Sequence, residues 1–175
     1  MIQVGQKCPD FEVPALKGTD VNASVKLSDY TGKWICLYFY PLDFTFVCPT
    51  EIKEFSDMVP EFEDRECQVL GGSCDSVFSH LGWTQAKDEL KDLKHPMISD
   101  YKKELSSALG ILDAEKGASQ RATFLIDPDG IVRFVYVTDL DVGRNPKEVL
   151  RVLDALQTDE MCPCNWQPGQ ETIQT

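Results

Sequence analysis

The chain has 175 residues, of which 42% are hydrophobic and 26% are charged, and its net charge is −12 at pH 7. This length and composition are typical of a single globular domain with its own hydrophobic core. The negative charge excludes nucleic acid and anionic membrane surfaces as expected partners, because both require a basic face on the protein.

The first strong signal along the chain is the apolar run 34–40, which predicts a buried strand. Seven residues are too few to span a membrane, so no membrane segment is expected. The N-terminal segment 1–7 lacks the layout of a signal peptide. We therefore expect a cytoplasmic protein, in which lasting structural disulfides are uncommon.

A helix is expected from Pro49 onward, because apolar residues then recur with helical spacing. The residues on this apolar stripe are Ile52, Phe55, Val59 and Phe62. Pro60 is expected to kink or shorten the helix. Residues 67–73 predict a second strand, in which the pair Gly71-Gly72 indicates a close approach of another chain segment.

The middle of the chain predicts a helix over residues 76–93 and a short strand over 95–99. A short helix over 102–109 should end at Gly110, because glycine readily adopts the left-handed conformation that closes a helix. These alternating strands and helices are typical of an α/β protein.

Two strands, 122–126 and 131–138, are expected to be joined by the turn Asp127-Pro128-Asp129-Gly130. The last helix should begin at Asn145 as N-cap, with Pro146 in its first turn. We therefore expect an α/β fold with a central mixed sheet flanked by helices over residues 1–157, followed by a polar tail over 158–175.

Cys48 stands where the helix after the first strand is expected to begin. Unpaired backbone N–H groups and the helix dipole at that position favour the thiolate over the thiol. Cysteines in such surroundings have pKa values of roughly 3.5–7.5. Since functional residues gather at strand-to-helix junctions of such sheets, Cys48 is a candidate nucleophile.

Pro41, Thr45 and Cys48 form a Pro-x-x-x-Thr-x-x-Cys pattern, and the stretch 41–51 resembles the active-site motif of the peroxiredoxins. The resemblance continues through the segments 75–83, 121–124, 142–144 and 162–166. It is greatest to the typical two-cysteine class, which includes the bacterial alkyl hydroperoxide reductase C group. The resemblance implies a thioredoxin-like fold and a thiol-dependent peroxidase of hydrogen peroxide and organic hydroperoxides.

The resemblance also implies a role for each residue of the site. The Cys48 thiolate would attack the peroxide, and Arg121 would stabilise both the thiolate and the leaving oxygen. Thr45 would accept the proton of the peroxide or hold its oxygen, and Pro41 would shield the sulfur from water. Glu51 would orient Arg121 through a charge-assisted hydrogen bond.

A second cysteine completes the cycle that the resemblance implies. Cys162 matches the resolving cysteine, which in this class reaches the sulfenic acid of the partner subunit. A homodimer with an intersubunit Cys48–Cys162 disulfide is therefore expected, in many relatives assembled as a decamer of five dimers. Thioredoxin or the alkyl hydroperoxide reductase flavoprotein would reduce the disulfide. Cys164 is a candidate spectator, alternative resolver or partner in disulfide exchange, and Arg144 is a candidate extension of the Glu51 network.

No cofactor or metal is expected, because the chain lacks a Gly-rich phosphate loop and Cys162 and Cys164 are too few ligands for a closed zinc centre. Two alternative functions remain open. A thiol–disulfide oxidoreductase would need a CxxC motif, but Glu51 occupies the second cysteine position. A redox-regulated holdase chaperone is compatible with the same sequence. The remaining cysteines are expected to be small buried apolar residues: Cys8, Cys36, Cys67 and Cys74.

Overall fold

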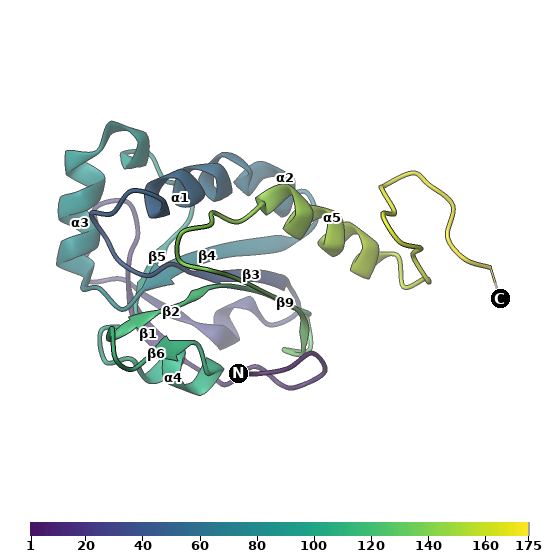
Figure 1. Cartoon of the computed structure of the whole chain (residues 1–175), viewed down its shortest axis with the longest axis horizontal. Coiled ribbons are helices and arrows are strands. Elements are labelled where there is room, and N and C mark those ends of the chain that lie inside the picture. The colour runs from purple at the N-terminus through teal and green to yellow at the C-terminus, as the bar shows by residue number, and fades with distance from the viewer. Residues whose placement is uncertain (175) are drawn as a thin grey trace.

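The computed structural model describes residues 1–174 and has a seven-stranded mixed sheet at its centre (Figure 1). The strand order is β2-β1-β5-β4-β3-β8-β9. The strands are β1 (Glu12–Leu16), β2 (Ser24–Lys26), β3 (Trp34–Phe39), β4 (Cys67–Ser73), β5 (Met97–Ser99), β8 (Arg121–Ile126) and β9 (Val132–Thr138). Strands β3, β4 and β5 are parallel, whereas β1 and β8 pair with them antiparallel. A two-stranded ribbon of β6 (Leu112–Asp113) and β7 (Ala118–Ser119) lies outside this sheet.

Helices cover both faces of the sheet. The helices are α1 (Cys48–Asp57), α2 (Val59–Glu63), α3 (Val77–Ala86), α4 (Glu104–Leu109) and α5 (Pro146–Gln157), with short 3₁₀ turns at Leu27–Tyr30 and Asp88–Leu90. Apolar residues of α1, α2, α3 and α5 share one core with the sheet. Those of α4 pack into a second core on the opposite face.

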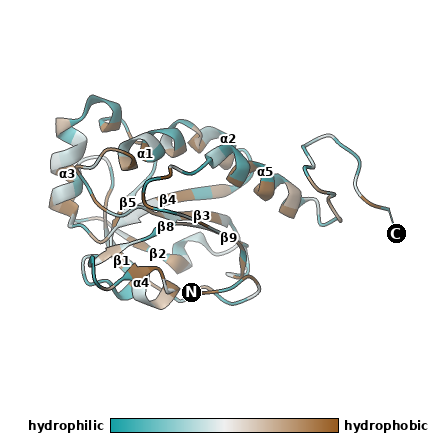
Figure 2. Cartoon of the chain, viewed as in Figure 1, coloured by the Kyte–Doolittle hydropathy of each residue, from teal (hydrophilic) through white to brown (hydrophobic). Residues whose placement is uncertain are grey.

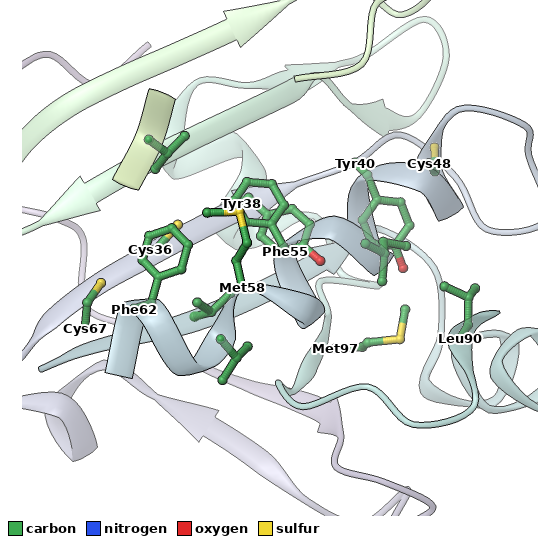
Figure 3. Close-up of a cluster of buried hydrophobic side chains, with 14 of the residues drawn as sticks. Cys36, Tyr38, Tyr40, Cys48, Phe55, Met58, Phe62, Cys67, Leu90 and Met97 are labelled. Atoms are coloured by element: carbon green, nitrogen blue, oxygen red, sulfur yellow. The ribbon is translucent and has the colours of Figure 1, made fainter. Parts of the chain in front are cut away.

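Strand β3 lies inside the sheet and contributes side chains to both cores, because successive side chains of a strand point to opposite faces of a sheet. Cys36 and Tyr38 belong to the core beneath α1, and Leu37 belongs to the other. Figure 3 shows the first core, in which the Tyr38 ring stacks on Phe55 with centroids 4.1 Å apart. A Cβ atom on Gly72 would lie 2.7 Å from the Ile98 backbone oxygen, which confirms the close approach expected at this glycine pair, and one on Gly71 would lie 2.4 Å from the Tyr38 ring.

The elements expected early in the chain are present with small shifts. The apolar strand ends at Phe39, and the helix after it begins at Cys48. This helix stops at Met58, and Pro60 lies in the first turn of the separate helix α2, so the shortening expected from Pro60 is confirmed. Sequence reasoning missed β1 and β2, whose strand character depends on antiparallel pairing with each other and with β5.

Three later elements are shorter in the structure than the sequence predicts. The helix expected over 76–93 ends at Ala86, because Lys87 takes an extended backbone conformation. The helix expected from residue 102 begins at Glu104, since Lys103 has a positive φ of 62°. The strand expected over 95–99 begins at Met97. Gly110 does close its helix in the left-handed conformation, with φ of 70°, as expected.

The segment after α5 has no helix or extended strand within residues 158–174, apart from an isolated bridge between Met161 and Ile173. Figure 2 shows it as mostly hydrophilic. Trp166 is nevertheless buried, and its carbonyl accepts a hydrogen bond from Arg151 of α5 at 2.9 Å. The division into a domain over 1–157 and a tail over 158–175 stays a prediction, and its last residue, Thr175, lies outside the described residues. Among residues 1–174, no helix has the length and apolar character needed to cross a membrane.

Candidate active site

Cys48 is the first residue of α1 and is completely buried. The loop 40–47 connects it to the end of β3, so the expected strand–loop–helix junction is confirmed. The N-cap residue of α1, Val47, forms no side-chain capping hydrogen bond, which leaves N–H groups and the helix dipole directed at this position. Figure 3 shows Cys48 at the end of α1 that lies near Tyr40.

Arg121 brings a positive charge to the Cys48 sulfur. It is the first residue of β8, which pairs antiparallel with β3 and therefore begins beside the end from which the loop to Cys48 departs. Its Nη1 donates a hydrogen bond to Cys48 Sγ at 3.2 Å, and its Nε donates to the Leu140 carbonyl at 2.7 Å. Burial acts to lower the pKa of Arg121, but the neighbouring Cys48 and Glu51 raise it more, so the guanidinium stays charged.

Glu51 is buried between two arginines. Its carboxylate accepts from Arg121 Nη1 at 2.7 Å, from Arg144 Nε at 2.7 Å and from Arg144 Nη2 at 2.9 Å. The Arg144 guanidinium also donates to the carbonyls of Phe39 and Ala122, each at 2.8 Å. Burial acts to raise the pKa of Glu51, but its hydrogen bonds and charge interactions with Arg144 and Arg121 outweigh burial and lower it. The expected Glu51–Arg121 hydrogen bond is present. Arg144 donates more hydrogen bonds to the same carboxylate than Arg121 does.

Pro41 and Thr45 lie in the loop before Cys48. Pro41 is buried and lines a surface pocket together with Ser119 and Leu140, the residue that also accepts from Arg121. The Thr45 hydroxyl donates to the Leu42 carbonyl at 2.8 Å. Since a hydroxyl has one proton to donate and two lone pairs, Thr45 is left able to accept a hydrogen bond from a substrate.

Cys162 is not brought to Cys48 within one chain. Its Sγ lies 3.5 Å from the Thr158 hydroxyl and 3.8 Å from the Ala155 carbonyl, at the end of α5. Figure 1 shows this tail extending beyond α5 and away from α1. Cys164 is exposed in the same tail. A disulfide with Cys48 therefore requires a second subunit or a large rearrangement of the tail.

The four cysteines expected to be apolar core residues are all buried. Burial raises the pKa of Cys8 and of Cys67 to about 12, and it also raises the pKa values of Cys36 and Cys74. These thiols therefore stay protonated near neutral pH. Cys48 differs from them in having a guanidinium in hydrogen-bond contact. Within residues 1–174, no group of three or more His, Cys, Asp or Glu side chains is arranged to hold a metal ion.

Sequence reasoning missed one part of the surroundings of the site. Neither Asp43, in the loop before Cys48, nor His80 of α3 was among the predicted site residues. The structure joins their side chains at 2.8 Å, although 37 residues separate them. Asp43 lies within the motif 41–51 and His80 within the segment 75–83, so both were within the residues that carried the family resemblance.

The helix start, the buried cysteine and its arginine define a thioredoxin-like enzyme that uses a cysteine nucleophile. The AhpC/TSA family model matches residues 4–135, and the chain belongs to this family. It is 46% identical over 184 residues to alkyl hydroperoxide reductase C of Mycolicibacterium smegmatis, covering 99% of this chain and 94% of the relative. It is 48% identical over 181 residues to the chloroplastic 2-cysteine peroxiredoxin of Chattonella marina var. antiqua, covering 98% and 92%.

Solved structures agree with this assignment. The reduced 2-Cys peroxiredoxin of Plasmodium vivax has a TM-score of 0.92 at 39% identity, covering 97% of this chain and 91% of that chain. AhpC of Mycobacterium tuberculosis has a TM-score of 0.86 at 44% identity, covering 95% and 99%. The predicted peroxiredoxin class, the thioredoxin-like fold and the thiol-dependent peroxidase function are thereby confirmed, and the two alternative functions are not favoured.

Proposed function

We propose that this protein reduces hydrogen peroxide and small organic hydroperoxides at Cys48. The observation that carries the proposal is the contact of Arg121 Nη1 with the buried Cys48 sulfur at 3.2 Å, at the start of a helix. A positive charge and a helix N-terminus both stabilise a thiolate, which is the nucleophilic form of cysteine.

In the proposed reaction the thiolate attacks one peroxide oxygen and the O–O bond breaks. The attacked oxygen stays on Cys48 as sulfenic acid, and the other leaves as an alkoxide or hydroxide that takes up a proton. Arg121 stabilises the charge that develops on the leaving oxygen, and Glu51 holds the guanidinium in place. Thr45 accepts a hydrogen bond from the peroxide, and Pro41 limits the access of water.

The sulfenic acid then condenses with a second thiol, which releases water and forms a disulfide. We propose Cys162 of the partner subunit as that thiol, because the tail of the same chain extends away from α1 (Figure 1). The working unit is then a homodimer, and a ring of five dimers is the assembly expected for this class. Thioredoxin or a flavoprotein disulfide reductase regenerates the thiols. A cytoplasmic location stays a prediction from the sequence.

Peptide mapping tests the whole cycle. The reduced protein is treated with one equivalent of hydrogen peroxide per subunit, alkylated, and digested without reductant. We expect a Cys48–Cys162 peptide in a covalent dimer, and its loss in Cys162→Ser but not in Cys164→Ser. A Cys48–Cys164 peptide would reassign the resolving residue, and the same disulfide within a monomer would contradict the subunit arrangement.

Substituting Arg121 with glutamine should slow the reaction of Cys48 with peroxide by ~10²–10³-fold, as for removal of a donor that stabilises developing charge. Alkylation of Cys48 by iodoacetamide should slow as well, because the thiolate loses its cationic partner. Rapid-mixing measurements of both rates check this. Arg133→Gln is the matched control, because Arg133 lies on β9 and its Nε donates a hydrogen bond to Asp127 at 2.6 Å. Both rates of this variant should stay within ~2-fold of wild type. Equal rates in Arg121→Gln and wild type would remove Arg121 from the mechanism.

A further inference from the structure

A buried polar cluster joins the loop before Cys48 to helix α3. Asp43 Oδ1 accepts a hydrogen bond from the Tyr40 hydroxyl at 2.8 Å, and Asp43 Oδ2 forms one with His80 Nδ1 at 2.8 Å. The Tyr40 oxygen also lies 3.3 Å from His80 Nδ1. The side chain of His80 is 0% exposed and that of Asp43 is 1% exposed. None of these three side chains has a part in the reaction described above.

The hydrogen bonds define the protonation of this cluster. His80 Nε2 lies 3.0 Å from the Ile98 carbonyl, which can only accept, so Nε2 carries a proton. Its Nδ1 shares a hydrogen bond with Asp43 Oδ2. Burial and the neighbouring Asp43 raise the pKa of Tyr40 well above its ordinary value, so its hydroxyl keeps its proton and donates. His80 therefore bridges the Ile98 carbonyl and the Asp43 carboxyl group inside the protein.

A buried polar pair is seldom the most stable way to fill a core, because desolvation of its polar groups offsets much of their attraction. Its geometry, however, is strongly specified. Here the pair attaches the loop to α3, and the Asp43 amide is attached separately to the Asp75 carboxylate at 2.9 Å. Both the side chain and the backbone amide of Asp43 thus hold the loop in place.

The residue after Asp43 also docks on α3. Phe44 has a positive φ of 57°, a conformation that bulky residues rarely adopt unless neighbours hold them in it. Its ring lies 5.9 Å from the ring of Trp83, one turn along α3 from His80. Thr45 follows directly, so the anchored residues are adjacent in sequence to a proposed substrate contact.

We propose that Asp43 and His80 are positioning residues for the peroxide reaction, holding the loop of Pro41 and Thr45 in the arrangement that receives the substrate. This inference rests on the proposed function of Cys48. Misplacement of a positioned group by ~1 Å can cost ~10²-fold in rate. Loss of the His80–Asp43 bond should therefore slow the peroxide reaction without removing the charge that Arg121 places at the sulfur.

Two isosteric substitutions separate this role from simple packing. His80→Asn places an amide nitrogen near the position of Nδ1 and keeps a donor for Asp43, whereas His80→Gln places one near Nε2 and keeps a donor for the Ile98 carbonyl. Asp43→Ala removes the same bond from the side of the loop and decides the question if His80→Gln does not fold. For each variant, the rates of Cys48 with hydrogen peroxide and with iodoacetamide are measured, together with thermal unfolding.

We expect His80→Gln and Asp43→Ala to react with peroxide ~10²-fold more slowly than wild type, and His80→Asn to stay within ~10-fold. Alkylation by iodoacetamide should change by less than ~3-fold in all of them, because it needs the thiolate but not the bound peroxide. Equal losses in His80→Asn and His80→Gln, or parallel losses of both reactions, would overturn the inference. If wild-type Cys48 itself reacted no faster than a free thiol, the proposed function would fail instead.

Discussion

Replacement of Cys48 with serine is expected to abolish the peroxide reaction, lowering its rate by on the order of 10⁴-fold or more, as for the loss of a catalytic nucleophile. The thiolate is the attacking group, and a serine hydroxyl must lose its proton to replace it. Arg121, which contacts the sulfur, is a donor without acceptor capacity and cannot take that proton. The decay of hydrogen peroxide in single-turnover experiments measures the loss.

The matched control is Cys74→Ser. The Cys74 sulfur lies 3.6 Å from the Ser106 hydroxyl, so a serine at this buried position finds a hydrogen-bond partner. Its peroxide rate should stay within ~2-fold of wild type. A Cys48→Ser protein that still consumed peroxide, or a Cys74→Ser protein that no longer did, would place the reactive thiol elsewhere.

Substitution of Glu51 with glutamine should have the largest effect on stability, about 3–5 kcal/mol of destabilisation. The change removes the only charge that the structure places between the Arg121 and Arg144 guanidinium groups among the described residues. Arg144 then loses its carboxylate partner, and Arg121 keeps the Cys48 sulfur but loses the carboxylate that aims it there. Urea unfolding of reduced wild type and variant, compared at one protein concentration, measures the difference.

The same carboxylate predicts a pH dependence. Its pKa is lower in the folded protein than in the unfolded chain, where an ordinary Glu has a pKa of about 4.3. The folded state therefore binds fewer protons in this range, and the stabilisation is complete above about pH 4.3 and is lost as the pH falls through the folded-state pKa. The difference in unfolding free energy between wild type and Glu51→Gln should shrink on acidification below about pH 4.

Asp57→Asn is the control for this effect, because Asp57 lies on the same helix but forms an exposed pair with Lys53. Surface pairs of this kind contribute about 0–1 kcal/mol, so little change is expected. Similar unfolding free energies for Glu51→Gln and Asp57→Asn would show that the arginines find other partners, and the proposed orienting role of Glu51 would then be withdrawn.

The local elements of the fold could be predicted because local chemistry specifies them. Asn145 accepts a hydrogen bond from the Lys147 amide at 3.1 Å, as expected of an N-cap, and Gly110 closes its helix in the left-handed conformation. Elements that depend on partners could not be predicted in this way. Strand β1 pairs with β2 and β5, and its mixed apolar and polar residues carry no signal of their own.

In the candidate site, too, the features specified locally could be predicted and the contacts between distant residues could not. Cys48 at a helix start was visible in the sequence, because the apolar strand and the amphipathic helix are local patterns on either side of it. Its contacts were not, since Arg121 is 73 residues away in the chain and the Glu51–Arg144 pair spans 93 residues. The motif resemblance supplied the role of Arg121, but it did not reveal that Arg144 makes more bonds to Glu51 than Arg121 does.

The sequence by itself indicated Cys48 as the candidate nucleophile, the order of most strands and helices from β3 onward, and the family to which the chain belongs. Only the tertiary structure decided how Arg144 shares Glu51 with Arg121 and how the loop before Cys48 is attached to α3. The physical reason is that strand pairing and core packing bring together residues remote in sequence. Burial then strengthens each hydrogen bond and each charge interaction, because the interior has a low dielectric constant. The Asp43–His80 pair shows this directly, because neither residue has a local pattern that predicts the other.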